Sequence, residues 1–367
     1  MTLSFYIGLR YLKSILWSFL AVAFLILLID GSDQIVSMSS KGLSSLLGIK
    51  NAFIRSPIHL LETLPLIVML GSLICFLGLT KSNELIITRS SGRSALRILL
   101  IPICITLVIG VIGTTIGNPV VAISIKSSEN FLENLGLKPK NLFSVSSDGI
   151  WLRETSTDNQ VVVHATRTNA SGTELFGLTL FQFDREDNLE KRIHAKQGRI
   201  KQDTWELENA KIWTYNSVEL SSEEIKFEKK PKILTKTNLT QDQILNSFSD
   251  PRAISFWSIP DFITRLEISG FSATRHKLFY QSELSRPLFL VAMMLIGTAF
   301  SLRYTRFGQT GLLVLVSVLV GFVLFSLNRV ALSLGEAQQI PIILATHGPP
   351  LAGILITIGL LLHLEDG

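Results

Sequence analysis

The feature that most constrains the fold is a set of long apolar runs that contain no charged residue. Crossing the hydrocarbon core of a bilayer takes roughly 20 residues of α-helix. Six runs approach or exceed this length, three on each side of a long polar segment: Ser14–Ile29, Thr63–Thr80, Ile98–Ile125, Pro287–Leu302, Phe307–Asn328 and Ala337–Leu362. Charged residues make up only 17% of the chain, against about 25% in soluble domains. We therefore expect six transmembrane helices.

Lysines and arginines in the short connections predict the orientation of these helices, because short cytoplasmic loops carry more of them than outer loops. With the N-terminus in the cytoplasm, eight such residues lie inside, and four lie outside: Lys41, Lys50, Arg55 and Arg329. The segment 126–282 then lies outside; it holds 21 basic and 21 acidic residues, so the net charge of +5 comes from the membrane half. We expect both termini in the cytoplasm and no nucleic-acid partner.

The polar segment changes to short runs that alternate between apolar and polar residues. Five such runs are separated by turn-like clusters: Gln160–Thr168, Glu174–Asp184, Leu189–Ile200, Thr204–Tyr215 and Ser222–Lys230. Their spacing predicts an antiparallel sandwich or open jelly roll. We expect its core to include Trp205, Leu207, Ile212 and Trp213. The edges of such a sheet could accept an added strand, or its apolar face could hold a lipid, and both alternatives remain open.

A helical pattern follows these strands. Ser258 and Asp261 have the spacing of a capping box, and apolar residues recur at helical intervals after them. We expect a short amphipathic helix that lies at the outer membrane surface and leads into the fourth span.

No pattern in the chain indicates catalysis. The nearest match to a phosphate-binding loop, GLSSLLGIK, has Ile49 where the lysine would stand, and the six histidines show no metal-site spacing. Cys75 and Cys104 both lie inside predicted spans and suit an apolar core. We therefore expect no catalytic residue, no cofactor and no metal site in this chain.

Three acidic residues stand at the ends of the predicted spans. Asp30 and Asp33 follow the first apolar run, and Glu62 precedes the second. An ionisable group inside a membrane usually faces a cavity or a partner, whereas one at the headgroup level is solvated by water, and both alternatives remain open. In the third run, Gly113 and Gly117 form a G-x-x-x-G pattern that predicts close helix packing.

The segment SNELIITRSSGRS, residues 82–94, is longer than a reversal between two spans requires. Ser82 or Asn83 can cap the start of a short helix, Glu84 suits its first turn, and Gly92 suits the left-handed position after it. Such a helix could dock on a soluble protein. The alternative is a capped loop whose arginines only fix the topology, and periodicity alone favours that alternative.

This segment resembles the loop after the second span in the lipopolysaccharide-export permeases, the LptF/LptG (YjgP/YjgQ) family. Four further stretches are similar to the family and favour its LptG branch: IDGSDQ, SPIHLLETLPLIVMLGSL, TNLTQDQI and SRPLFLVAMMLIGTAFSL. The resemblance implies an α+β membrane protein in which a periplasmic antiparallel β-jellyroll is inserted between two sets of three transmembrane helices. Its expected parts are residues 1–125, with a coupling helix at about 82–92, residues 126–282 and residues 283–367.

The resemblance also implies a function in the bacterial inner membrane. A permease of this family pairs with an LptF-like chain above a dimeric LptB-like ATPase, and it extracts lipopolysaccharide from the membrane. It passes this lipid to two partners. The LptA-like partner is a periplasmic jellyroll protein, and the LptC-like partner has a single span. Glu84, Leu85, Arg89 and Gly92 match the family's helix that contacts the ATPase.

One position departs from the LptG pattern. Chains of that type can carry basic residues just after the Asp-Gln pair that ends the first span, where the lipid phosphates would be met, but here Asp33 and Gln34 are followed by Ile35. Other cations are therefore candidates for binding lipopolysaccharide: Lys126, Arg286, Arg55 and Lys41. We prefer Lys126, because it ends the third span, where a cavity would open.

Two other classes of function remain as alternatives. The chain could have the paralogous LptF role or be another lipid-handling ABC permease, which would still need an ATPase partner. It could also be a membrane receptor or scaffold with an outer β-domain. A receptor is expected to have a cytoplasmic output domain, whereas here the last apolar run is followed directly by HLEDG.

Overall fold

A computed structural model of the chain separates into two compact units, which we describe one at a time. The helical unit comprises residues 1–131, 252–257 and 277–367, and the sheet unit comprises residues 132–251 and 258–276. The structure describes residues 2–84, 95–137, 143–146, 149–155, 160–168, 174–184, 188–201, 204–215, 226–236, 250–268, 272–301 and 310–366.

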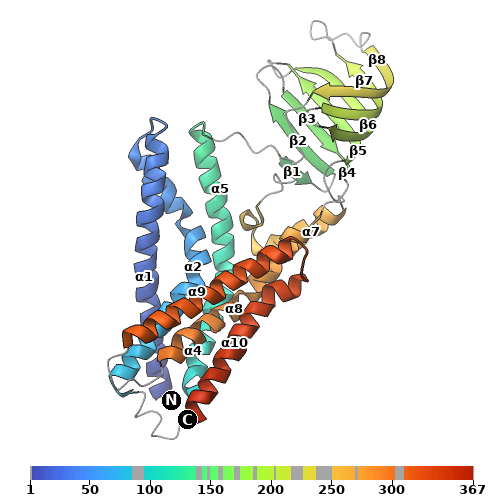
Figure 1. The fold of residues 1–367 in the computed structure, drawn as a ribbon. Helices are drawn as coiled ribbons and strands as arrows, with labels where there is room; N and C mark the ends of the chain where they lie inside the picture. The colour runs from blue at the N-terminus through green and yellow to red at the C-terminus, as the bar shows by residue number, and fades with distance from the viewer. Residues whose placement is uncertain are drawn as a thin grey trace. The chain divides into compact units, whose positions relative to one another are not determined.

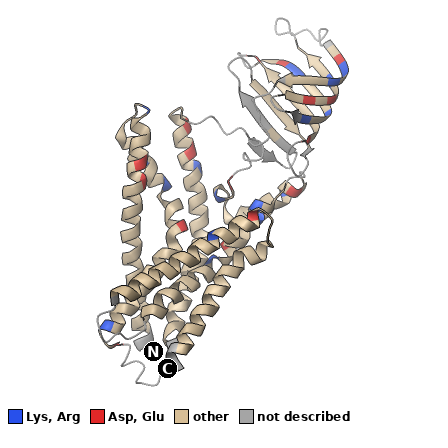
Figure 2. Ribbon diagram, in the orientation of Figure 1, with Lys and Arg blue, Asp and Glu red and all other residues tan. Residues whose placement is uncertain are grey.

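The helical unit consists of long apolar helices (Figure 1). Their bounds are α1 Thr2–Ser39, α2 Ser45–Lys81, α4 Ala95–Ile112, the π-helical turn η1 Gly113–Gly117, α5 Asn118–Asn134, α8 Thr274–Ser301, α9 Thr310–Glu336 and α10 Ile342–Asp366. Because α4, η1 and α5 are continuous, the described residues contain six helical segments long and apolar enough to cross a membrane. Most of this unit is free of charged side chains (Figure 2). The six predicted spans are confirmed.

The helices differ widely in how much of their apolar surface they bury within the chain. In the most apolar window of α8, 72% of the residues are buried, against 11% in α1 and 17% in α9. Leu290, Met293 and Met294 of α8 are fully buried, and they belong to two core clusters that draw on the neighbouring helices. Thus α8 is the centre of the helical unit, whereas α1 and α9 expose apolar faces to lipid or to another chain.

The closest backbone approach of the third span to α8 lies outside the predicted G-x-x-x-G pattern. A Cβ atom added at Gly117 would lie 3.0 Å from Cδ1 of Leu61 in α2, whereas one added at Gly110 would lie 2.5 Å from the Cα atom of Pro287 in α8. The predicted close packing is therefore confirmed at Gly117, and Gly110, which was not predicted, allows a still closer approach.

The sheet unit is built on one antiparallel sheet in the order β1-β2-β3-β5-β6-β7-β8, with β4 paired to β5. The strands are β1 Phe143–Ser146, β2 Gly149–Thr155, β3 Gln160–Ala165, β4 Arg167–Thr168, β5 Glu174–Phe183, β6 Leu189–Lys201, β7 Thr204–Thr214 and β8 Lys226–Lys236. Four of the five predicted runs are confirmed as strands. The fifth run is a strand from Lys226 onward, in β8, and its first four residues lie outside the described residues. The strands β1 and β2 were not predicted. Since the described strands form a single sheet, an open jelly roll is favoured over a closed sandwich.

A line of irregular residues crosses this sheet. Gly177 in β5 and Asn209 in β7 have positive φ angles of 62° and 54°, and β8 has Pro231 beside Asn209. At this line the inward-facing positions change from odd to even numbers, as from Leu207 to Ala210 in β7. Such irregularities bend strands and increase their twist. The line lets the sheet curve around its core (Figure 1).

The core of the sheet unit lies on one face of the sheet. Trp205 and Leu207 are fully buried there and Ile212 packs beside them, as predicted. Trp213 was expected in the core but faces the other way, because the irregular residue Asn209 shifts the alternation of β7 so that Ile212 points inward. Its ring packs instead against Arg192 and Phe227, at 5.4 and 5.6 Å.

The amphipathic helix predicted after the strands is confirmed as α7, Ile259–Ile268. Its apolar side chains pack inside the sheet unit, and its place at the outer membrane surface stays a prediction. Leu266 is buried in the core of that unit, and Phe262 and Ile263 pack against the same cluster. Two short 3₁₀ turns, η2 Pro251–Ala253 and η3 Phe256–Ser258, precede α7.

Candidate functional site

Glu84, the acidic residue of the expected coupling helix, lies three residues after the end of α2 at Lys81. The backbone N–H of Ser82 donates to Gly78, and Asn83 has a left-handed φ of 58°, so these two residues terminate α2. They were also expected to cap the start of the next helix, and Glu84, directly after them, is helical, whereas residues 85–94 lie outside the described residues. Of the other predicted coupling residues, Leu85, Arg89 and Gly92 lie outside the described residues.

Glu84 is bound to the first helix. Its two carboxylate oxygens lie 2.7 and 2.9 Å from Nη1 of Arg10, and Ser82 Oγ donates to it at 2.7 Å. The hydrogen bond from Ser82 and that from Arg10 hold the pKa of Glu84 below its usual range. The carboxylate is therefore charged at neutral pH and joins the ends of α1 and α2.

The acidic residues of the first span have different surroundings. Asp30 Oδ1 lies 3.6 Å from Nε2 of His59 in α2, and Asp33 is exposed. Next to them, the buried amide of Asn51 donates to Gln34 at 2.8 Å and accepts from Ser128 of α5 at 2.9 Å. Polar contacts thus join α1, α2 and α5 at this end of the bundle.

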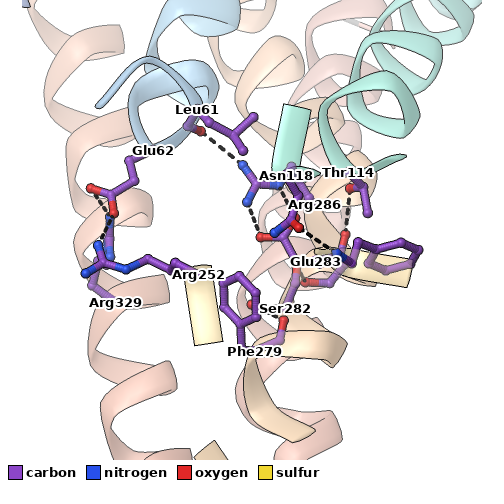
Figure 3. A network of polar contacts seen from close by, with 12 residues as sticks. Leu61, Glu62, Thr114, Asn118, Arg252, Phe279, Ser282, Glu283, Arg286 and Arg329 are labelled. Atoms are coloured by element: carbon purple, nitrogen blue, oxygen red, sulfur yellow. Dashed lines mark hydrogen bonds and ion pairs between the residues drawn. The ribbon is translucent and has the colours of Figure 1, made fainter. Parts of the chain in front are cut away.

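A buried ion pair lies in α8. Glu283 is only 1% exposed; Nη2 of Arg286 contacts its Oε1, and Nε donates to Oε2 at 3.1 Å. Nη1 of Arg286 donates to the carbonyl oxygen of Leu61 in α2 at 3.0 Å, and Thr114 Oγ1 donates to the carbonyl oxygen of Glu283 at 2.9 Å (Figure 3). We call Glu283 and Arg286 the Glu283 pair. Because the guanidinium of Arg286 is engaged inside the bundle, this geometry favours a structural role over lipid binding.

A second cluster of charged side chains lies beside the Glu283 pair. It is centred on Glu62, the residue of α2 that follows Leu61. Glu62 Oε1 accepts a hydrogen bond from Arg252 at 2.7 Å, and its Oε2 lies 3.7 Å from Nη2 of Arg329 in α9 (Figure 3). We call these three residues the Glu62 cluster. Glu62 therefore connects α2 both to α9 and to the first residue of the helical unit after the sheet.

The segment that contains Arg252 is fixed to the third span as well. The backbone N–H of Phe256 donates to Asn118 at 2.8 Å, and the indole N–H of Trp257 donates to the carbonyl oxygen of Thr115 at 3.2 Å. Thr115 belongs to η1, whose π-helical turn widens the helix locally.

The remaining predicted cations lie on the surface of the helical unit. Lys126 is exposed on α5, Lys41 is exposed in the turn after α1, and Arg55 is half-buried on α2. None of the three forms an ion pair with another described residue. No group of three His, Cys, Asp or Glu side chains that could hold a metal occurs in the described part of the chain.

Comparison with known proteins agrees with this arrangement of helices and sheet. The sequence profile of the family described as "Lipopolysaccharide export system permease LptF/LptG" matches residues 5–363. The chain belongs to the LptF/LptG family. It is also similar to the lipopolysaccharide export system permease protein LptG of Haemophilus influenzae, with 25% identity over 82% of each chain. The protein of the same name in Escherichia coli K12 is 24% identical over 82% of this chain and 81% of its own length.

The LptF/LptG membership and the six apolar helices establish that the chain is a permease subunit for lipopolysaccharide export and a multi-pass inner-membrane protein.

Several polar contacts of this permease were not predicted. The spacing of Glu283 and Arg286, three residues apart on a helix, is a signal that could have revealed their pairing. In contrast, 190 residues separate Glu62 from Arg252, and no sequence pattern links them.

Proposed function

We propose that this permease subunit is the LptG-type half of a transporter that pairs with an LptF-like chain. Support comes mainly from the relatives that carry the LptG name, each aligned with 82% of this chain. The exposed apolar face of α1 suits contact with a second membrane chain, because only 11% of its most apolar window is buried within this one.

Purification in mild detergent tests this pairing. Co-expressed with candidate chains, the protein should form a complex that contains an LptF-like chain and two copies of an LptB-like ATPase. Recovery of the protein alone in several detergents would contradict the proposal. Pairing with an LptG-type chain in place of the LptF-like one would assign the LptF role instead.

We propose that the ATPase acts on this chain through Glu84 and the residues after it, and that ATP is hydrolysed on the ATPase. The carboxylate at the end of α2 is charged and is tied to α1, so a displacement at Glu84 would be transmitted to both helices. We also propose that both termini lie in the cytoplasm and the sheet unit in the periplasm, an orientation that the distribution of Lys and Arg supports.

We propose that lipopolysaccharide leaves the membrane beside the third span, with Lys126, Arg55 and Lys41 as contacts for its phosphates. Ammonium and guanidinium groups form charge-assisted hydrogen bonds with phosphate. A photo-cross-linker at position 126 should capture lipopolysaccharide. Failure at that position, when neighbouring positions of α5 react, would exclude Lys126.

The sheet unit would then pass the lipid to LptA-like and LptC-like partners. Its terminal strands β1 and β8 have an unpaired edge among the described strands, and such edges can accept a strand from another sheet. Disulfide cross-linking from cysteines placed along β8 to a jellyroll partner tests this contact.

A further inference from the structure

The Glu62 cluster has an uneven geometry. Arg252 donates a hydrogen bond to Glu62 at 2.7 Å, whereas Arg329 stays 3.7 Å from the same carboxylate, beyond hydrogen-bonding distance. The guanidinium of Arg329 also lies over the ring of Phe325, 5.5 Å from its centroid. Arg329 is therefore held in place without a hydrogen bond to any described residue.

Exposure separates this cluster from the neighbouring Glu283 pair. The side chains of Arg252 and Arg329 are 47% and 55% exposed, whereas that of Arg286 is 17% exposed and its nitrogens are occupied. Only the first two arginines can therefore meet a molecule from outside the chain. A guanidinium matches the geometry of a phosphate group and can bind two of its oxygens at once.

The helix that carries Arg329 also offers an apolar surface. Leu315, Phe322 and Arg329 are spaced seven residues apart, so they lie along one face of α9, and all three side chains are more than half exposed. A run of apolar side chains that ends in a cation fits an amphiphile with acyl chains and an anionic headgroup.

We propose that Arg252 and Arg329 form a binding site for the phosphate of a lipid headgroup, with the acyl chains along α9. Without lipid, the carboxylate of Glu62 is the anion between the two arginines. When a lipid binds, its phosphate replaces this carboxylate beside Arg329. The proposal rests on the lipid-export function proposed above and names a headgroup site for it. It also explains why one carboxylate stands between two exposed arginines from distant parts of the chain.

Binding to the full-length chain in detergent tests the site, with bisphosphorylated lipid A and enzymatically dephosphorylated lipid A as probes. Wild-type protein should bind the phosphorylated probe more tightly. Arg329→Ala should weaken that binding about tenfold, the effect of losing one charge-assisted contact, and leave the dephosphorylated probe unaffected. Arg329→Lys should lose less affinity for the phosphorylated probe than Arg329→Ala does. Glu62→Gln should bind the phosphorylated probe more tightly than wild type, because the competing carboxylate is gone.

Lys50→Ala provides a matched control. Lys50 is an exposed cation on α2 that lies over the ring of Phe131 at 5.2 Å, much as Arg329 lies over Phe325. The site is excluded if Arg329→Ala and Arg252→Ala change lipid A binding no more than this control does. It is also excluded if wild-type protein binds both probes equally, or if Glu62→Gln binds the phosphorylated probe more weakly while remaining folded.

Competitors identify the source of the phosphate. If phosphatidylglycerol displaces lipid A from the wild-type protein but not from Arg329→Ala, this would support a headgroup site that also accepts phospholipids. Displacement by inorganic phosphate at similar concentration would contradict a lipid site.

Failure of this site is distinguishable from failure of the proposed function. If the assembled transporter exports lipopolysaccharide but Arg329→Ala keeps its phosphate preference, only the site is wrong; if no export occurs, the function is wrong whatever the arginines bind.

Discussion

Arg10 and Glu84 join the first turns of the chain to the end of the second span, with Nη1 of Arg10 between the two carboxylate oxygens at 2.7 and 2.9 Å. The side chains are 30% and 33% exposed, so the contact itself contributes no more than about 1 kcal/mol to stability. Its effect is on position: it fixes Glu84, the residue expected to meet the ATPase, relative to α1.

We therefore expect Arg10→Ala to weaken ATPase association and lipopolysaccharide export with little change in thermal stability. Glu84→Ala should do the same, and the double variant should be no worse than the single ones, because both remove one contact. Lys13→Ala, at an exposed position of the same helix, serves as the control. Co-purification and export assays measure these effects. Normal association and export in both single variants would remove this contact from the coupling.

Removing one partner of the Glu283 pair should be far more damaging. Arg286→Ala leaves the buried carboxylate of Glu283 without its counter-charge, and such changes cost about 3–5 kcal/mol. We expect a low yield of folded protein and a clearly lower melting temperature. The double variant Glu283→Gln with Arg286→Gln should recover most of the loss, because no charge remains buried. If Arg286→Ala instead melts like wild type and loses only lipid binding, Arg286 is a lipid ligand.

Gly110 should not tolerate a side chain. A Cβ atom there would lie 2.5 Å from Pro287 Cα and 2.9 Å from Pro287 Cβ, and backbone atoms cannot move aside as a flexible side chain would. We expect Gly110→Ala to destabilise the helical unit by about 1–3 kcal/mol, as overpacking does. At Gly113 the nearest atom, Leu64 Cδ2, is 3.4 Å away, so Gly113→Ala should be tolerated. Thermal unfolding in detergent compares the two, and equal melting temperatures would contradict this packing.

His194 should make the sheet unit sensitive to acid. Burial lowers its pKa, and the positive charges of Arg192 and Lys211 lower it further, while Nδ1 lies 3.0 Å from Thr179 Oγ1. In the unfolded chain the pKa returns to about 6.5. Below that pH the unfolded state takes up a proton that the folded state resists, so stability falls as the pH falls.

The expected outcome is faster hydrogen exchange in β5 and β6 at pH 5.5 than at pH 7.5, after correction for the intrinsic rates. His194→Gln should reduce this difference, because glutamine does not titrate. The same acid sensitivity in wild type and variant would assign the effect to other groups.

Much of the fold was predictable because its signals are local. Single segments of the sequence contain the uncharged runs long enough to span a bilayer and the alternating pattern of the strands. These local patterns predicted the six helices and most of the sheet. The exceptions have local causes as well. Trp213 was assigned to the wrong face because the irregular residue Asn209 shifts the alternation of β7, and periodicity does not reveal a single such residue.

The sequence by itself determined that this chain is a membrane permease with an inserted sheet, since hydrophobic length, strand period and family motifs need no knowledge of the packing. Only the tertiary structure decided which charges meet. Glu84 reaches Arg10 across 74 residues and Glu62 reaches Arg252 across 190, while Arg286, a candidate for lipid binding, is neutralised by Glu283. An isolated Arg or Glu has the same appearance in a sequence whether it binds a ligand or pairs inside the protein. Only helix packing brings its partner within reach.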